Sequence, residues 1–154
     1  MSGIVVVSGN PRPGSRTSGL ASAVGAALGG ASTLIEVGAL GAGLLTPGDV
    51  ATAAAVTAIR EADVLVVATP TYKGSYTGVL KVLLDQLPAQ ALAGKRAVPV
   101  VTAGVAPQAA AAAALLAQLL SELGANVAPA LPVIEAELPE SAAIAEKYAA
   151  AHGR

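Results

Sequence analysis

The chain has 154 residues, of which 54% are hydrophobic and only 2% aromatic, and its formal net charge is −1. A chain of this length is expected to form one domain with a single core, so residues 1–154 are predicted to be one domain. The near-zero charge argues against a nucleic-acid-binding protein, because phosphate backbones reward strongly basic faces. The absence of cysteine excludes disulfides, thiol catalysis and Cys-ligated metals.

The first predicted elements are a strand at 4–8 and a helix at 17–29, joined by a loop rich in Gly, Pro and hydroxyl residues. This arrangement favours phosphate binding, because a helix start presents free N–H groups and the positive end of its dipole. No acidic residue precedes Glu36, so nothing nearby is expected to offset the arginines of the loop. The alternative is an ordinary turn in which a Ser or Thr caps the helix. The charged and hydroxyl side chains of the loop are Arg12, Arg16, Ser15, Thr17 and Ser18.

The loop matches neither of the two common phosphate motifs. It has no Lys before a hydroxyl residue, as a P-loop requires, and no Gly-x-Gly-x-x-Gly. Glu36 lies within the predicted second strand, 33–37, and does not close it where a ribose would need an acid. The loop therefore favours a phosphomonoester over a pyrophosphate. A Gly-rich connection at 38–48 leads from this strand to a predicted helix at 49–60.

The third predicted strand, 63–68, enters a second Gly-rich loop, which leads to a helix at 77–87. This loop holds Tyr72 and Tyr76, two of the three tyrosines of a chain that has no Phe or Trp. Placing such scarce aromatic residues in a turn favours a flat ring bound there by backbone N–H groups and an aromatic edge. The alternative is that the tyrosines anchor the turn or contact another subunit.

The fourth predicted strand is 97–102, and a third loop at 102–108 follows it. A helix at 108–123 and a fifth strand within 126–134, broken by two prolines, come next, and a helix at 140–151 follows. Near-continuous apolar strands joined by helices predict a parallel sheet that is covered on both faces. Ligands of such sheets bind beyond the carboxyl ends of the strands, which is where the three loops lie.

Two of these loops carry family motifs. The first reads Gly-Asn-Pro-Arg-Pro-Gly-Ser-Arg-Thr over residues 9–17, and the second reads Pro-Thr-Tyr-Lys-Gly-Ser-Tyr-Thr-Gly-Val-Leu-Lys over residues 70–81. Both resemble the NADPH-dependent FMN reductase family of flavodoxin-like proteins, most closely the flavin reductases that supply reduced FMN to alkanesulfonate monooxygenases. Asn10 stands where the family usually has Ser, and its amide can still donate to a phosphate oxygen.

The resemblance implies an α/β, flavodoxin-like fold with a five-stranded parallel sheet in the order 2-1-3-4-5 and helices on both faces. It also implies an NAD(P)H-dependent FMN reductase in which hydride moves from nicotinamide to FMN, without a catalytic side chain of the protein. The residues implied to hold the FMN phosphate are Asn10, Arg12, Ser15, Thr17 and Ser18, with Arg16 on either the FMN or the NADPH phosphate. The residues implied to line the flavin ring are Pro70, Thr71, Tyr72, Lys73, Gly74 and Ser75, with Thr102, Ala103 and Gly104 at its far edge.

Three alternatives stay open. The same bound FMN can serve a quinone, azo or chromate reductase. A flavodoxin-type electron carrier usually has a strongly acidic face, whereas this chain has ten acidic residues against nine basic ones. A family member that binds flavin poorly is the third alternative, because the third loop lacks the paired Gly and the nearby His that relatives often show.

The resemblance further implies a homodimer or homotetramer, with flavin and nicotinamide as small-molecule partners and a flavin-dependent monooxygenase as a possible protein partner. The apolar helix 108–123 supports an oligomer, because Glu122 is its only charged residue. We expect no membrane or nucleic-acid partner and no metal. No targeting pattern precedes the first strand, so we expect a cytoplasmic location.

Overall fold

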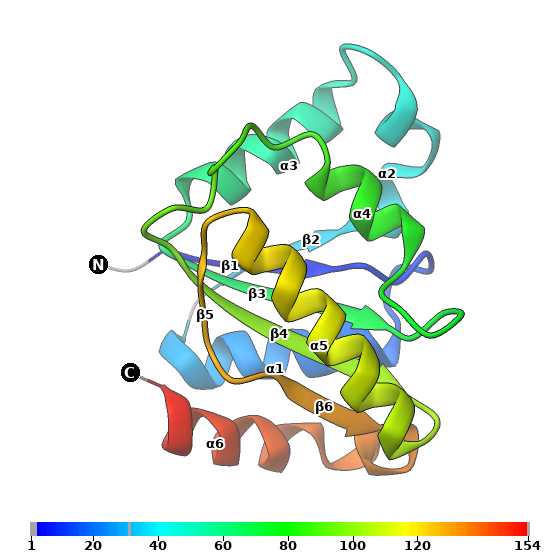
Figure 1. Ribbon diagram of the computed structural model, residues 1–154, viewed down its shortest axis with the longest axis vertical. Coiled ribbons are helices and arrows are strands. Elements are labelled where there is room, and N and C mark those ends of the chain that lie inside the picture. Colours follow the sequence, from blue (N-terminus) through cyan, green and yellow to red (C-terminus); the bar gives the residue numbers. More distant parts are fainter. Residues whose placement is uncertain (1–2, 31, 154) are drawn as a thin grey trace.

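The computed structural model describes residues 3–30 and 32–153, which form a parallel sheet between two layers of helices (Figure 1). The strands are β1 (Ile4–Ser8), β2 (Thr33–Glu36), β3 (Val64–Pro70), β4 (Arg96–Ala103), β5 (Asn126–Val127) and β6 (Leu131–Ile134). The α-helices are α1 (Arg16–Gly29), α2 (Val37–Leu40), α3 (Val50–Glu61), α4 (Gly78–Leu84), α5 (Ala106–Glu122) and α6 (Ser141–His152). Two 3-10 helices complete the fold, η1 (Gly41–Leu45) and η2 (Glu135–Glu140).

The strand order is β2-β1-β3-β4-β5, and every pair is parallel, which confirms the predicted order. Two short strands together occupy the fifth position of the sheet, beside β4. β5 pairs with the start of β4, and β6 pairs with its second half. The break lies at 128–130 and contains Pro129. The prediction that Pro132 also breaks the strand is wrong. Pro132 lies within β6 at the edge of the sheet, where a residue without an N–H group is tolerated.

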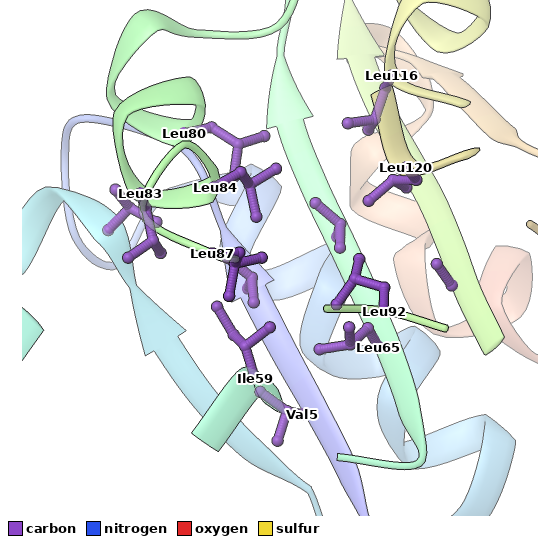
Figure 2. Close-up of a cluster of buried hydrophobic side chains, with 14 of the residues drawn as sticks. Val5, Ile59, Leu65, Leu80, Leu83, Leu84, Leu87, Leu92, Leu116 and Leu120 are labelled. Atoms are coloured by element: carbon purple, nitrogen blue, oxygen red, sulfur yellow. The ribbon is translucent and has the colours of Figure 1, made fainter. Parts of the chain in front are cut away.

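Alternate side chains of the strands face opposite layers. Val5 and Val7 pack in one core cluster with residues of α3, α4 and α5, whereas Ile4 and Val6 pack in a second cluster with residues of α1 and α6. Figure 1 shows the same division, with α3, α4 and α5 on one side of the sheet and α1 and α6 on the other. Figure 2 shows the leucines that fill the first cluster, among them Leu80, Leu83, Leu84, Leu116 and Leu120.

The Gly-rich connection at 38–48 contains two short helices that the sequence did not indicate, α2 and η1. Apolar burial explains the difference: Leu44 is buried and Leu40 packs against the first core cluster. The following helix, α3, begins after Asp49, whose carboxylate accepts hydrogen bonds from the Thr52 N–H group at 2.9 Å and the Thr52 hydroxyl at 2.7 Å. These hydrogen bonds lower the pKa of Asp49.

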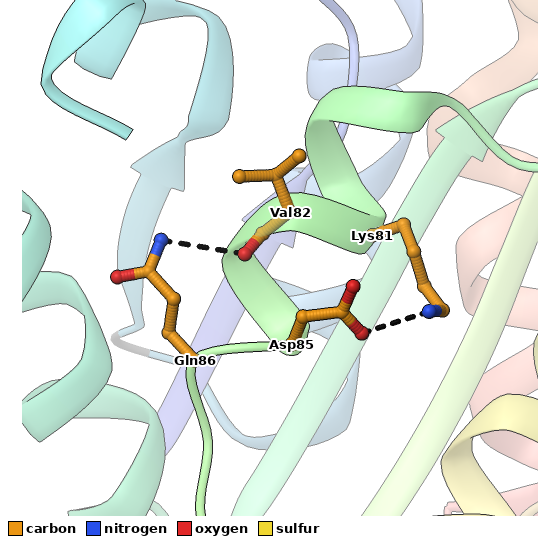
Figure 3. Close-up of polar contacts among 4 residues, drawn as sticks. All are labelled: Lys81, Val82, Asp85 and Gln86. Carbon is orange, nitrogen blue, oxygen red and sulfur yellow. Dashed lines mark hydrogen bonds and ion pairs between the residues drawn. The ribbon is translucent and has the colours of Figure 1, made fainter. Parts of the chain in front are cut away.

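Helix α4 is shorter than the predicted helix 77–87, because the chain tightens into i→i−3 hydrogen bonds after Leu84. Lys81 is paired with Asp85 at 2.8 Å on the exposed side of this helix, and the hydrogen bond raises the pKa of Lys81 (Figure 3). Gln86 donates to the carbonyl oxygens of Val82 and Leu44, so it joins the end of α4 to η1. Lys81 is thus a surface charge.

Within the described residues, no single helix has the length and apolar character needed to cross a membrane. Among these same residues, one pair of segments, Val37–Leu45 and Val50–Glu61, meets that test when taken together, and the two are bent by 118° relative to each other.

Thr77 joins the end of β1 to the start of α4. Its hydroxyl donates to the carbonyl oxygen of Gly9 at 2.6 Å and accepts from the N–H group of Leu80 at 3.3 Å, so it also caps α4. Gly9 has no space for a side chain, because a Cβ atom there would lie 2.8 Å from the Cβ of Leu80. The close contact between the first loop and α4 therefore depends on a residue without a side chain and on one buried hydroxyl.

We expect Thr77→Val to lower the free energy of unfolding by about 2–4 kcal/mol, since it removes a helix cap and leaves a buried carbonyl oxygen without its donor. In a chain of this size that corresponds to a fall in Tm of roughly 5–15 °C, measurable by thermal unfolding. Thr77→Ser is the matched control, because it keeps the hydroxyl and should lose far less. Equal melting temperatures for the two variants would contradict the assigned role of the hydroxyl.

Candidate functional site

The loops that follow β1, β3 and β4 meet at the carboxyl edge of the sheet, since these three strands are neighbours and run in parallel (Figure 1). Threonine side chains connect the loops. The hydroxyls of Thr17 and Thr102 lie 2.9 Å apart, and the hydroxyl of Thr71 donates to the carbonyl oxygen of Thr102 at 2.9 Å. The end of β4 is therefore attached to the start of α1 and to the second loop.

A small hollow of about 110 Å³ opens between the loops. Its volume is below the roughly 300–1,000 Å³ of pockets that enclose a whole ligand, so it suits a small polar group at the end of a larger molecule. Eight of its lining residues are predicted site residues, namely Asn10, Arg12, Ser15, Arg16, Thr17, Pro70, Tyr72 and Thr102. Two lining residues were not predicted, Glu135 and Leu138.

The first loop presents donors to this hollow. Ser15 is the N-cap of α1, and its hydroxyl oxygen accepts from the N–H group of Ser18 at 3.2 Å. The side-chain oxygen of Asn10 accepts from the N–H group of Arg12 at 2.9 Å, which leaves the amide NH₂ as the end that can donate to a ligand. A capped helix start, an amide and two guanidinium groups form a donor set suited to an anion.

Two acidic side chains reach the first loop, so the prediction that nothing offsets its arginines is wrong. Glu36, at the end of β2, accepts from the N–H group of Gly14 and from the hydroxyl of Ser18, each at 2.6 Å. Glu135, at the start of η2, lies 4.0 Å from the guanidinium of Arg16. Neither acid is near the loop in sequence, and only the strand order brings them to it.

Ser18 is buried and does not line the hollow. Its hydroxyl oxygen lies 2.6 Å from the hydroxyl oxygen of Ser8 and 3.1 Å from that of Ser15, in addition to its bond to Glu36. Ser18 thus faces the β1–β2 side of the loop, and its hydroxyl lies next to that of Ser15, which lines the hollow.

The second loop contains a tight turn at Lys73 and Gly74, whose φ angles are 52° and 82°. Tyr72 and Ser75 exchange backbone hydrogen bonds of 2.9 and 3.2 Å across this turn, so their N–H groups are occupied. In the part of the chain that the structure covers, the N–H groups of Lys73 and Gly74 have no partner and are available to a ligand. These two are therefore the donors of the turn that fit the predicted role.

The two tyrosines of this loop have different surroundings. Tyr72 lines the hollow and is 46% exposed, as a ring that meets a ligand would be. Tyr76 is partly buried and packs against the first core cluster, so the anchoring alternative fits it. The predicted third loop begins later than expected, because β4 extends to Ala103. Thr102, at the end of β4, lines the hollow, whereas Ala103 is buried and Gly104 is exposed, and neither of the latter lines it.

Sequence reasoning missed Glu36, Glu135 and Leu138. The prediction that Glu36 lies inside the second strand and does not close it is wrong, because β2 ends at Glu36 and Val37 begins α2. Glu36 pairs in register with Ser8 at the end of β1. Glu135 and Leu138 follow the divided fifth strand, whose path the sequence did not indicate. No group of three or more potential metal ligands occurs among residues 3–30 and 32–153.

Comparison with known proteins places this chain in a family. The family model described as NADPH-dependent FMN reductase matches residues 3–137. An FMN reductase (NADPH) of Escherichia coli strain K12 is 46% identical over 68 residues, which are 44% of this chain and 36% of that protein. An FMN reductase (NADPH) of Pseudomonas putida strain KT2440 is 52% identical over 46 residues, 30% of this chain and 23% of that protein. The matched segments thus span about a third or less of these two relatives.

Among solved structures, the apo form of an NADH:FMN oxidoreductase (EMOB) superposes with a TM-score of 0.82 at 31% identity. The match covers 99% of this chain and 90% of that one, so the likeness extends over the whole fold.

The site also depends on Gly38. A Cβ atom at Gly38 would lie 2.2 Å from the carbonyl oxygen of Pro11 and 2.7 Å from that of Asn10, so the start of α2 rests directly on the backbone of the first loop. We expect Gly38→Ala to displace this loop, to lower the free energy of unfolding by about 1–3 kcal/mol and to weaken FMN binding in a titration.

The matched control is Gly19→Ala in α1, where a Cβ atom would meet nothing within 4 Å. That variant should be stabilised by about 0.5–1 kcal/mol, because Ala is a better helix former than Gly. If Gly38→Ala bound FMN as the unaltered chain does, the first loop would not depend on this contact.

Proposed function

This chain belongs to the NADPH-dependent FMN reductase family, and on that premise we propose that it reduces FMN at the expense of NADPH. The supporting observation is the convergence of eight predicted residues from three loops on one hollow at the carboxyl edge of the sheet. Bound FMN would accept a hydride from the nicotinamide, and the protein would supply binding and orientation.

The residues present fit the phosphate of FMN. The hollow is small and lined by Arg12, Ser15 and Thr17, and it lies at the start of the 14-residue helix α1. Two guanidinium groups, hydroxyls and an amide are donors that complement a phosphate monoester. Arg12 is exposed, so its guanidinium can close over a bound phosphate without displacing core residues.

The second loop suits the flavin ring. Pro70 and Tyr72 border the hollow, and the free N–H groups of Lys73 and Gly74 lie in the adjacent turn, where they can donate to carbonyl oxygens of the ring. Thr71 and Thr102 fix the distance between this loop and the third loop. Their hydrogen bond holds the polar edge of the proposed ring site in place.

Arg16 and Lys73 are the cations available to the 2′-phosphate that distinguishes NADPH from NADH. Arg16 and Glu135 are both more than half exposed, with side-chain exposures of 67% and 57%. An exposed pair at 4.0 Å contributes little free energy, so Arg16 can leave Glu135 for a phosphate at small cost.

We further propose that the chain forms a homo-oligomer through the exposed face of α5. Leu115 on this helix is 41% exposed, and it borders a groove formed with Tyr76, Gln118, Leu119 and Glu122. An exposed apolar side chain beside a groove favours contact with another protein surface. The cytoplasmic location and the flavin-dependent monooxygenase partner stay predictions.

If Arg12 and its neighbours bind the FMN phosphate, the protein should bind FMN more tightly than riboflavin, which has no phosphate. Arg12→Ala should weaken FMN binding about tenfold to a hundredfold, the effect of one charge-assisted contact of about 1.5–3 kcal/mol, and leave riboflavin binding unchanged. Fluorescence titration of both flavins measures this. Equal affinities for the two flavins would contradict the placement of the phosphate.

The activity is tested by anaerobic mixing of FMN-loaded protein with NADPH. The flavin absorbance should bleach within seconds or less, since typical kcat values are about 1–10³ s⁻¹. Steady-state NADPH oxidation with FMN, a quinone or an azo dye as acceptor then identifies the preferred acceptor. Flavin that stays oxidised with both NADPH and NADH but is reduced by dithionite would favour the electron-carrier alternative.

A further inference from the structure

Glu36 holds the first loop from a side that does not line the hollow. It ends β2 and lies in register with Ser8, the last residue of β1. One carboxylate oxygen accepts from the N–H group of Gly14 and the other from the hydroxyl of Ser18, both at 2.6 Å. Gly14 directly precedes Ser15, and the N–H group of Ser18 donates to the Ser15 hydroxyl. The Glu36 carboxylate therefore binds two neighbours of Ser15, which itself lines the hollow.

The direction of the hydroxyl bonds follows from proton counting. An ionised carboxylate only accepts, so Ser18 must donate its single hydroxyl proton to Glu36. The hydroxyl oxygens of Ser8 and Ser15, 2.6 and 3.1 Å from that of Ser18, can then bond to it only as donors. With its proton turned toward Ser18, Ser15 offers a lone pair to the hollow, and a lone pair repels a phosphate oxygen.

The charge of Glu36 acts in the same direction. No side-chain nitrogen of Lys or Arg lies within 4.0 Å of its carboxylate oxygens in the described part of the chain. Its negative charge next to the first loop therefore opposes the attraction that Arg12 and Arg16 exert on an anion. It also occupies the N–H group of Gly14, which could otherwise serve as a phosphate donor.

We propose that Glu36 is a positioning residue that weakens the hold of the first loop on the FMN phosphate, by turning the Ser15 hydroxyl away and by its own charge. The proposal rests on the function proposed above. In this role Glu36 keeps the affinity for FMN low enough that reduced FMN can leave the protein.

Glu36→Gln separates this role from simple support of the loop. The Gln side chain has nearly the same shape, its oxygen can accept from Gly14, and its NH₂ group can donate to Ser18. The donor directions are then reversed: Ser18 can donate to Ser8 or Ser15, and the Ser15 proton is free to point into the hollow. Loss of support would weaken FMN binding, whereas the proposed role requires that this variant binds FMN more tightly.

The experiment is a titration of the Glu36→Gln protein with FMN and with riboflavin, together with thermal unfolding in increasing inorganic phosphate. We expect FMN affinity to rise about tenfold, the effect of one regained hydrogen bond and one removed charge. Riboflavin affinity should stay unchanged, and inorganic phosphate should stabilise the variant more than the unaltered chain. Glu61→Gln is the matched control. It also removes one negative charge, but at the exposed end of α3, which lies just before the amino end of β3 and thus away from the carboxyl edge of the sheet.

A second variant tests the hydroxyl chain alone. Ser18→Ala keeps the charge of Glu36 but frees the Ser15 proton, so FMN affinity should rise by less than in Glu36→Gln. It also provides the test if Glu36→Gln does not fold. FMN affinity that is unchanged or lower, or that rises equally for riboflavin, would overturn the proposal.

Failure of the proposed function gives a different result. The unaltered chain would then bind neither FMN nor riboflavin. The rise in melting temperature with inorganic phosphate, compared between the unaltered chain and Glu36→Gln, would still test the role of Glu36. Equal stabilisation by phosphate in that case would overturn the role of Glu36 as well.

Discussion

The hydrogen bond from the Thr77 hydroxyl to the Gly9 carbonyl oxygen is the contact on which the site depends. It joins the loop after β1 to the start of α4, and it is possible only because Gly9 has no side chain to collide with Leu80. The same hydroxyl caps α4, so the helix and the first loop are positioned by a single group. With Thr71 and Thr102 attaching the third loop, the donors of the hollow are fixed by short polar side chains and not by bulky packing.

The fold was largely predictable because its strands are short apolar runs that Gly and Pro separate clearly. Order and parallel pairing follow from the alternation of strands and helices together with the family motifs. The Gly-rich composition of 38–48 gave no indication of α2 and η1, which form because Leu40 and Leu44 pack against the first core cluster. The predicted break at Pro132 was wrong because a proline interrupts a central strand but is tolerated in a strand at the edge of the sheet, where β6 lies.

The site was predictable where its residues belong to the two loop motifs, and not where partners come from distant segments. Asn10, Arg12, Ser15 and Tyr72 are found together at the hollow as the motifs suggested. Glu36 and Glu135 reach the loop through strand register and the path after β6, which depend on tertiary structure. The direction of the Ser18 hydroxyl could not be inferred either, because it is set by that unforeseen carboxylate.

The turn at Lys73 and Gly74 has a thermodynamic consequence. Both residues have positive φ angles, and the backbone bonds between Tyr72 and Ser75 close the turn. The direction of the N–H groups of Lys73 and Gly74 is thus fixed by bonds within the loop itself. Association at this loop loses little conformational entropy, so a larger share of each new hydrogen bond contributes to affinity.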